Sequence, residues 1–228
     1  MGQVGTEWRG ATARYVSANR GAAQLGDYVG NIDDKKDDYL ALNFSDLKFP
    51  SKEMIAKVFE GCTFNKCDFS EAVFKRCKFI ECHFIKCNLS VAKVGNSRFS
   101  DVVFEECKMV GVDWTTANWS SLALGSPIKI HKCIINDSSF FGLDMKGMVL
   151  EECKAHDVDF REGNFTEANF SHTDFSNSLF HKTNLTGANF QEAVNFNIDV
   201  NTNKVMRAKF SRYEAVRLLE SLGIELLD

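Results

Sequence analysis

Eight cysteines and five histidines are the residues of this 228-residue chain that are best suited to metal, redox or nucleophilic chemistry. No two cysteines have the C-x-x-C spacing of a zinc site. No phosphate-binding, dinucleotide-binding, nucleophile-elbow or H-E-x-x-H motif occurs either. The histidines are expected to face outward, far apart, at positions His83, His131, His156, His172 and His181. We therefore expect no catalytic residue, no metal site and no cofactor, and we expect that the protein is not an enzyme.

The cysteines share one position in a repeated pattern. Each stands two residues before the central residue of a five-residue unit, as Cys62 does before Phe64 and Cys107 before Met109. Residues two apart in an extended chain point to the same side, and a free cysteine packs as a small hydrophobe. We expect all eight to be buried, reduced and metal-free, which suits a reducing cytoplasm: Cys62, Cys67, Cys77, Cys82, Cys87, Cys107, Cys133 and Cys153.

The large apolar residues themselves recur every five positions. From Phe59 to Leu89 the run is unbroken, and 17 of the 20 phenylalanines of the chain fall on this register. A period of five is neither the 2 of a strand nor the 3.6 of a helix, so it indicates a structural repeat. The chain has to turn within each unit to keep the cysteine and the phenylalanine inside. The pattern predicts coils stacked at about 4.8 Å, with each phenylalanine on that of the neighbouring coil.

Two units give the pattern its family likeness: Ala168-Asn169-Phe170-Ser171-His172 and Ala188-Asn189-Phe190-Gln191-Glu192. They resemble the A(D/N)LXX consensus of pentapeptide-repeat proteins, in which Leu or Phe is the central residue. The resemblance implies an all-β solenoid, a right-handed quadrilateral β-helix with four units per coil.

The repeat divides the chain into three parts. Residues 1–40 carry no repeat and are expected to be a flexible or weakly helical tail, part of which covers the first coil. Residues 41–196 are expected to form about seven to eight coils, a body of about 35 Å. A loop is expected near 50–58, because Lys52 and Lys57 fall on small-residue positions where a lysine is not buried unpaired. A second break is expected at 125–129, where the step from Leu124 to Ile130 is six.

Residues 197–228 are expected to form a C-terminal cap with a helix. Ser211-Arg212-Tyr213-Glu214 reads as a capping box, and Gly223 reads as the helix stop. One apolar face would cover the last coil and the other would form a homodimer, through Tyr213, Val216, Leu219, Leu222 and Ile224.

Charge differs between the two halves of the repeat. Residues 41–94 hold nine Lys/Arg and six Asp/Glu, whereas residues 133–196 hold ten Asp/Glu and four Lys/Arg. Regularly spaced carboxylates on a rigid rod can imitate the phosphate rows of a duplex. The carboxylates expected to bind a partner in this way are Asp137, Asp144, Glu151, Glu152, Asp157, Asp159, Glu162 and Glu167, with Asp157, Asp159 and Glu162 as one cluster. No apolar run long enough to span a membrane and no signal core occur, so no membrane partner and a cytoplasmic location are expected.

The whole pattern, a repeat with two interruptions and a terminal helix, is similar to the Qnr, MfpA and microcin-immunity group of the family. The resemblance implies a non-enzymatic DNA mimic that binds DNA gyrase or topoisomerase IV, makes no direct contact with nucleic acid, and protects the enzyme from quinolones or peptide toxins. Two segments are expected to project and touch the enzyme: Pro50, Ser51, Lys52 and Glu53, and Gly125, Ser126 and Pro127. The alternative is an interaction scaffold with no topoisomerase role.

Overall fold

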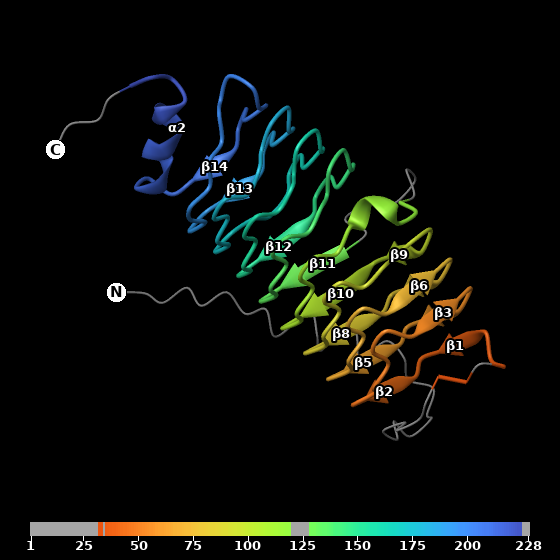
Figure 1. Cartoon of the computed structure of the whole chain (residues 1–228). Helices are drawn as coiled ribbons and strands as arrows, with labels where there is room; N and C mark the ends of the chain where they lie inside the picture. The colour runs from red at the N-terminus through yellow and green to blue at the C-terminus, as the bar shows by residue number, and fades with distance from the viewer. Residues whose placement is uncertain (1–31, 34, 120–127, 225–228) are drawn as a thin grey trace, which may run out of the picture.

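The structure, a computed structural model, describes residues 32–33, 35–119 and 128–224 and shows a stack of coils (Figure 1). Each segment pairs in parallel with the one twenty residues further on, as Phe44 does with Phe64 and Phe64 with Phe84. Twenty residues are four units of five, so each coil has four faces. The fold is the predicted right-handed, four-sided β-solenoid, with about 8 turns and a short C-terminal helix.

The strands are short because each face spans only one five-residue unit. Face I holds β1 (Asp38–Leu40), β4 (Val58–Glu60), β7 (Lys78–Ile80) and β9 (Arg98–Ser100). Face II holds β2 (Asn43–Ser45), β5 (Thr63–Asn65), β8 (His83–Ile85), β10 (Val102–Glu105), β11 (Ile128–His131) and β12 (Val149–Glu151), and β13 (Asn189–Phe190) and β14 (Lys209–Phe210) pair further along it. Face III consists of isolated parallel bridges, from Lys48–Asp68 to Asp174–Val194. Face IV begins with β3 (Glu53–Ile55) and β6 (Val73–Lys75).

The core is a set of aromatic stacks that run along the rod. The ring centroid of Phe79 lies 5.2 Å from those of Phe59 and Phe99, with interplanar angles of 6° and 14°. Phe74 and Phe84, its neighbours within the coil, meet it edge to face. The expected placement of each phenylalanine on that of the next coil is therefore confirmed.

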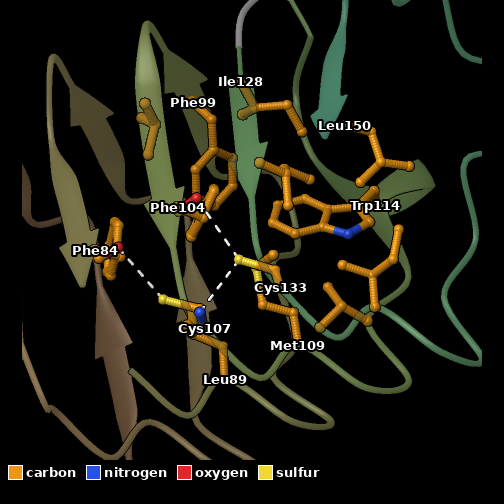
Figure 2. Close-up of a cluster of buried hydrophobic side chains, with 14 of the residues drawn as sticks. Phe84, Leu89, Phe99, Phe104, Cys107, Met109, Trp114, Ile128, Cys133 and Leu150 are labelled. Carbon is orange, nitrogen blue, oxygen red and sulfur yellow. Dashed lines mark hydrogen bonds between the residues drawn. The ribbon is translucent and has the colours of Figure 1, made fainter. Parts of the chain in front are cut away.

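The cysteines do more than fill space. All eight are buried, with at most 3% of their surface exposed. Figure 2 shows how the thiol of Cys107 donates to the carbonyl oxygen of Phe84 (3.3 Å), while the backbone N–H of Cys107 donates to the sulfur of Cys133 (3.2 Å). Ser97 takes the same position and donates to the carbonyl oxygen of Phe74 (3.0 Å). We call the apolar residue in the middle of each five-residue unit its centre. The position two before each centre thus holds a small side chain that often also hydrogen-bonds neighbouring coils. The sequence pattern did not predict this second role.

The thiols are expected to react slowly in the folded protein. Burial raises the pKa of Cys77 and raises that of Cys153 to about 12, and the hydrogen bond with Cys107 raises the pKa of Cys87 to about 12. The hydrogen bond with Cys82 instead lowers the pKa of Cys62, so this thiol is protected by its complete burial alone. Since the thiolate is the reactive form, iodoacetamide at pH 8 should label none of the eight rapidly in the native state and all eight in denaturant. Mass spectrometry after timed labelling measures this, and rapid native labelling of several cysteines would contradict the burial described here.

The corners of the coil impose a second requirement. The residue two positions after most centres adopts a left-handed backbone, with φ of 54° at Asp46 and 57° at Asp157. Residues other than glycine enter this region at a cost of about 1–2 kcal/mol. The cost is offset by hydrogen bonds between coils, such as that from the Asp46 N–H to the Asn65 carbonyl oxygen (2.9 Å). The glycines at five such corners, among them Gly61 and Gly187, follow from this geometry.

The N-terminal end corrects two sequence predictions. No loop leaves the coil near 50–58, because β3 pairs with β6 and Met54 is buried opposite Phe74. Lys57 is buried yet partnered: its ammonium donates to the carbonyl oxygen of Lys36 (2.7 Å) and pairs with the carboxylate of Asp37 (3.0 Å). The repeat also begins before residue 41.

The first centre of the solenoid is Tyr39, whose ring stacks on Phe59 at 4.8 Å. The hydroxyl of Tyr39 donates to the carbonyl oxygen of Asp33 (2.9 Å), and Ile32 is buried against the core. The residues just before the first coil therefore cover its open end, as expected.

The second break is larger than the sequence pattern suggests. Phe104 of β10 pairs with Phe84 at the usual turn of twenty, but its partner on the other side, in β11, is Ile130. Six residues are therefore inserted in this coil, where the sequence pattern predicted a single extra residue. The 3-10 turn η1 (Trp114–Thr116) and the half-buried Trp119 precede the break. Gly125, Ser126 and Pro127 lie outside the described residues.

The solenoid continues past the predicted boundary at residue 196. Phe180 bridges Ile198, slightly short of a full turn, but Asn184 bridges Lys204 at the usual spacing of twenty. The backbone is irregular at Asn195, so the five-residue pattern in the sequence does not detect this last coil. The coil is nevertheless present, because the ring of Phe210 stacks on that of Phe190 at 5.0 Å.

The C-terminal cap is shorter than predicted. It consists of the 3-10 turn η2 (Glu214–Val216) and α2 (Arg217–Glu220), and Gly223 with φ of 68° follows them as predicted. The capping box is absent, because the Ser211 hydroxyl donates to the carboxylate of Glu192 (3.2 Å) instead. Leu218 packs on the last coil. Within the part of the chain that is described, no helix is long and apolar enough to cross a membrane.

Candidate binding surface

The acidic residues predicted to form the binding surface lie on all four sides of the rod. Asp144 lies on face I, Glu151 on face II and Asp159 on face IV, each next to a buried centre. The other five occupy corners with positive φ: Glu167 between faces I and II, Glu152 between II and III, Asp137 and Asp157 between III and IV, and Glu162 between IV and I. The expected cluster of Asp157, Asp159 and Glu162 is therefore divided, since Glu162 lies at the next corner.

Most of these carboxylates lie within salt-bridge distance of a basic side chain. Lys146 pairs with Glu167, Lys132 with Glu152 and Lys182 with Glu162, all between exposed side chains. His131 lies 3.4 Å from Glu151. Exposed pairs contribute little stability, but they reduce the negative potential of a surface. These four carboxylates are therefore poor elements of a phosphate-like row.

One corner nevertheless gathers several of the predicted residues. Ser51 lies at the corner between faces III and IV in the first coil, with Glu53 beside it on face IV. Asp137 and Asp157 lie at the same corner further along, with Asp159 beside Asp157 on face IV. Glu71 and Asp113 complete the row, and the sequence analysis missed both. We call this row the acidic edge: Glu53, Glu71, Asp113, Asp137, Asp157 and Asp159.

The carboxylates of the acidic edge differ in their partners. Asp137 and Asp157 are exposed, occupy the same corner of successive coils, and have no ion pair among the described residues. Glu71 accepts a hydrogen bond from Ser51 (3.1 Å), and Asp113 accepts one from the Thr115 N–H at the start of η1 (3.0 Å).

Asp159 is held ionised by its neighbour. Burial alone would raise its pKa, but two hydrogen bonds from the Arg161 guanidinium, of 2.9 and 2.8 Å, lower it below the usual value. Asp137 and Asp157 therefore carry negative charge on the acidic edge that no ion pair among the described residues neutralises.

The predicted projecting segment is an ordinary part of the first coil. Pro50, Ser51, Lys52 and Glu53 are exposed at its corner, and the Lys52 ammonium lies 5.6 Å from the Phe49 ring centroid. A cavity of about 270 Å³ opens beside them and is lined by Ile32, Asp37, Phe49, Glu53, Met54, Ile55 and Lys57. The N-terminal end of the rod therefore has a cavity at its surface, but residues 50–53 do not project from the coil.

Three of the five histidines are less exposed than expected, whereas His172 and His181 are exposed as expected. His83, His131 and His156 are half-buried, each within 3.4 Å of a carboxylate oxygen of Glu105, Glu151 or Asp174. Burial lowers the pKa of His83. No group of three His, Cys, Asp or Glu side chains suited to a metal ion occurs in residues 32–33, 35–119 and 128–224.

The C-terminal cap leaves an apolar surface uncovered. The exposed fraction is 88% for Tyr213, 50% for Leu222, 47% for Ile224 and 44% for Val216, while Leu219 is half-buried. Several large apolar side chains exposed within one short segment are typical of an association surface. We call these five residues the terminal apolar surface.

Comparisons with known proteins agree with this architecture. A family model described as pentapeptide repeat region matches residues 57–126 and 124–190. No protein with a curated description matches the chain.

Among solved structures, a trypsin-treated variant of QnrB1, a plasmid-mediated fluoroquinolone resistance protein, is 20% identical with a TM-score of 0.64, covering 83% of this chain and 100% of that one. A second trypsin-treated variant of QnrB1 is 21% identical with a TM-score of 0.60, covering 87% and 96%. Full-length QnrB1 is 21% identical with a TM-score of 0.51, covering 82% and 100%. At this identity the likeness shows the fold.

Proposed function

Because the chain belongs to the pentapeptide-repeat family, we propose that it is a non-enzymatic binding protein that engages DNA gyrase or topoisomerase IV and protects the enzyme from quinolones or peptide toxins. Such a role requires a cytoplasmic protein. The acidic edge would contact the enzyme where it otherwise holds DNA, because carboxylates on a rigid rod present charge of the same sign as phosphates.

The observation that carries the proposal is the likeness to QnrB1, which extends over the whole of that chain. QnrB1 is described as a fluoroquinolone resistance protein, and this chain has the same solenoid fold, followed by α2. The acidic edge supports the proposal, because Asp137 and Asp157 are exposed on a rigid backbone.

Direct binding is the test. Purified full-length protein should bind immobilised gyrase and topoisomerase IV, and duplex DNA added in excess should displace it. If it binds neither enzyme at micromolar concentration, or if DNA leaves binding unchanged, the proposed competition with DNA is wrong.

A second candidate is an interaction scaffold with no topoisomerase role. It is favoured by one observation: the predicted carboxylates lie on four sides, and several are neutralised by lysines. A scaffold would bind neither topoisomerase, so the same experiment separates the two functions.

The terminal apolar surface is proposed to form a homodimer. Tyr213→Glu combined with Leu222→Glu should convert a dimer into a monomer, because each change places a charge in an apolar contact. Light scattering of the full chain measures the mass. The matched control is Leu40→Glu at the opposite end, where 68% of the side chain is exposed, and it should leave the dimer intact. A monomeric unmodified chain would remove this proposal.

A further inference from the structure

A cluster of positive charge lies at the corner between faces IV and I in the first half of the rod. Lys75 and Arg76 end face IV in one coil, and Lys78 begins face I. In the next coil, Arg98 pairs in register with Lys78. We call Lys75, Arg76, Lys78 and Arg98 the basic edge. The turn of twenty places Arg98 beside the other three residues.

These cations are exposed and available. None makes an ion pair with a described residue, whereas Lys86, Lys132 and Lys146 elsewhere on the rod each pair with a glutamate. Residues 73–80 and 93–100 contain no Asp or Glu. The positive charge of the basic edge is therefore not neutralised within the patch.

The surroundings of the cations favour phosphate over an acidic protein surface. Gly95, Asn96 and Ser100 lie between them, and the Nε of Arg98 donates to the Ser100 hydroxyl (3.1 Å), which holds its guanidinium at the corner. Protein–protein contacts usually centre on buried aromatic or aliphatic anchors, whereas phosphate contacts use Arg, Lys, Ser, Asn and backbone groups. Flat coils about 4.8 Å apart give a straight, rigid edge that can follow a backbone.

We propose that the basic edge binds the phosphate backbone of duplex DNA without sequence preference. This departs from the sequence-based expectation of no direct contact with nucleic acid. It is independent of topoisomerase binding, and the acidic edge lies at a different corner of the rod.

The test is fluorescence anisotropy of a labelled 24-base-pair duplex with the full chain at 50 mM salt. Four phosphate contacts predict a slope of log K against log salt of about −3.6, which is roughly a 150-fold loss of affinity between 50 and 200 mM. The combined change Lys75→Glu, Arg76→Glu and Lys78→Glu should weaken binding about 10-fold or more and reduce the slope to about −1.

The matched control is Lys48→Glu, Lys108→Glu and Lys154→Glu, three exposed lysines of face III that change the net charge equally. Binding by the control should remain within about threefold of the unmodified chain, since its cations lie outside the basic edge. Equal losses in both variants would mean a net-charge effect and overturn the proposal. No binding at 50 mM salt would overturn it as well, and so would tighter binding of a labelled polyglutamate peptide than of the duplex.

Discussion

Phe79→Ala is expected to lower the free energy of unfolding by about 3–5 kcal/mol, the usual cost of truncating a phenylalanine in a packed core. Phe79 is 1% exposed and stacks between Phe59 and Phe99. Removing its ring therefore interrupts a stack that extends through several coils and leaves a cavity that rigid coils cannot close. Chemical denaturation followed by circular dichroism measures the change.

Lys78→Ala is the matched control, since Lys78 is the adjacent residue on the outward side. Its effect on the free energy of unfolding should stay within about 0.5 kcal/mol. Equal effects from the two changes would contradict the register that puts Phe79 inside.

Asp137→Lys combined with Asp157→Lys is expected to weaken binding to the topoisomerase about 10-fold or more. These two carboxylates are exposed on successive coils of the acidic edge and have no ion pair among the described residues, so reversal places positive charge against a groove that is built for phosphate. Binding of purified enzyme at 50 and 200 mM salt measures the effect, which should be larger at low salt.

Glu152→Lys combined with Glu162→Lys is the control with the same change in charge. Both residues occupy corners with positive φ, but at other edges, and each is already paired with a lysine. Binding should change by less than about threefold. If both pairs of substitutions weaken binding equally, net charge rather than the acidic edge governs the interaction.

The interior of the fold could be predicted from the sequence because one physical requirement repeats. A large apolar residue every five positions, with a small one two before it, admits few arrangements other than a four-sided coil. Phe59, Phe79 and Phe99 and the cysteines lie where that pattern put them. The same reasoning failed at Lys57, because it assumed that a lysine buried at this position would have no partner. In the structure its ammonium group is partnered by the carbonyl oxygen of Lys36 and the carboxylate of Asp37, which precede it by one turn.

The ends of the solenoid could not be placed from the pattern alone. A shortened turn at Ile198 breaks the five-residue count, although the coil continues to Phe210. At the N-terminal end, Tyr39 is the only centre before residue 41, and one apolar residue is not enough to show that the repeat begins there.

The charged surfaces were harder to predict, because residues that are close in sequence often lie at different corners of the coil, whereas residues one turn apart lie at the same corner. Glu162 follows Asp159 closely in sequence but lies around a corner, whereas Asp137 and Asp157 are twenty apart and occupy the same corner. Counting outward positions at intervals of twenty would have found Glu71, Asp113 and the basic edge.

The measurement that tests the proposed function most directly is DNA supercoiling by purified gyrase with ciprofloxacin, with and without the full-length protein. The proposal predicts that the protein restores supercoiling in the presence of the drug, and that the Asp137→Lys, Asp157→Lys variant restores it much less. If the unmodified protein neither inhibits gyrase nor restores its activity against a quinolone or a peptide toxin, and topoisomerase IV gives the same result, the protein is a scaffold for another partner.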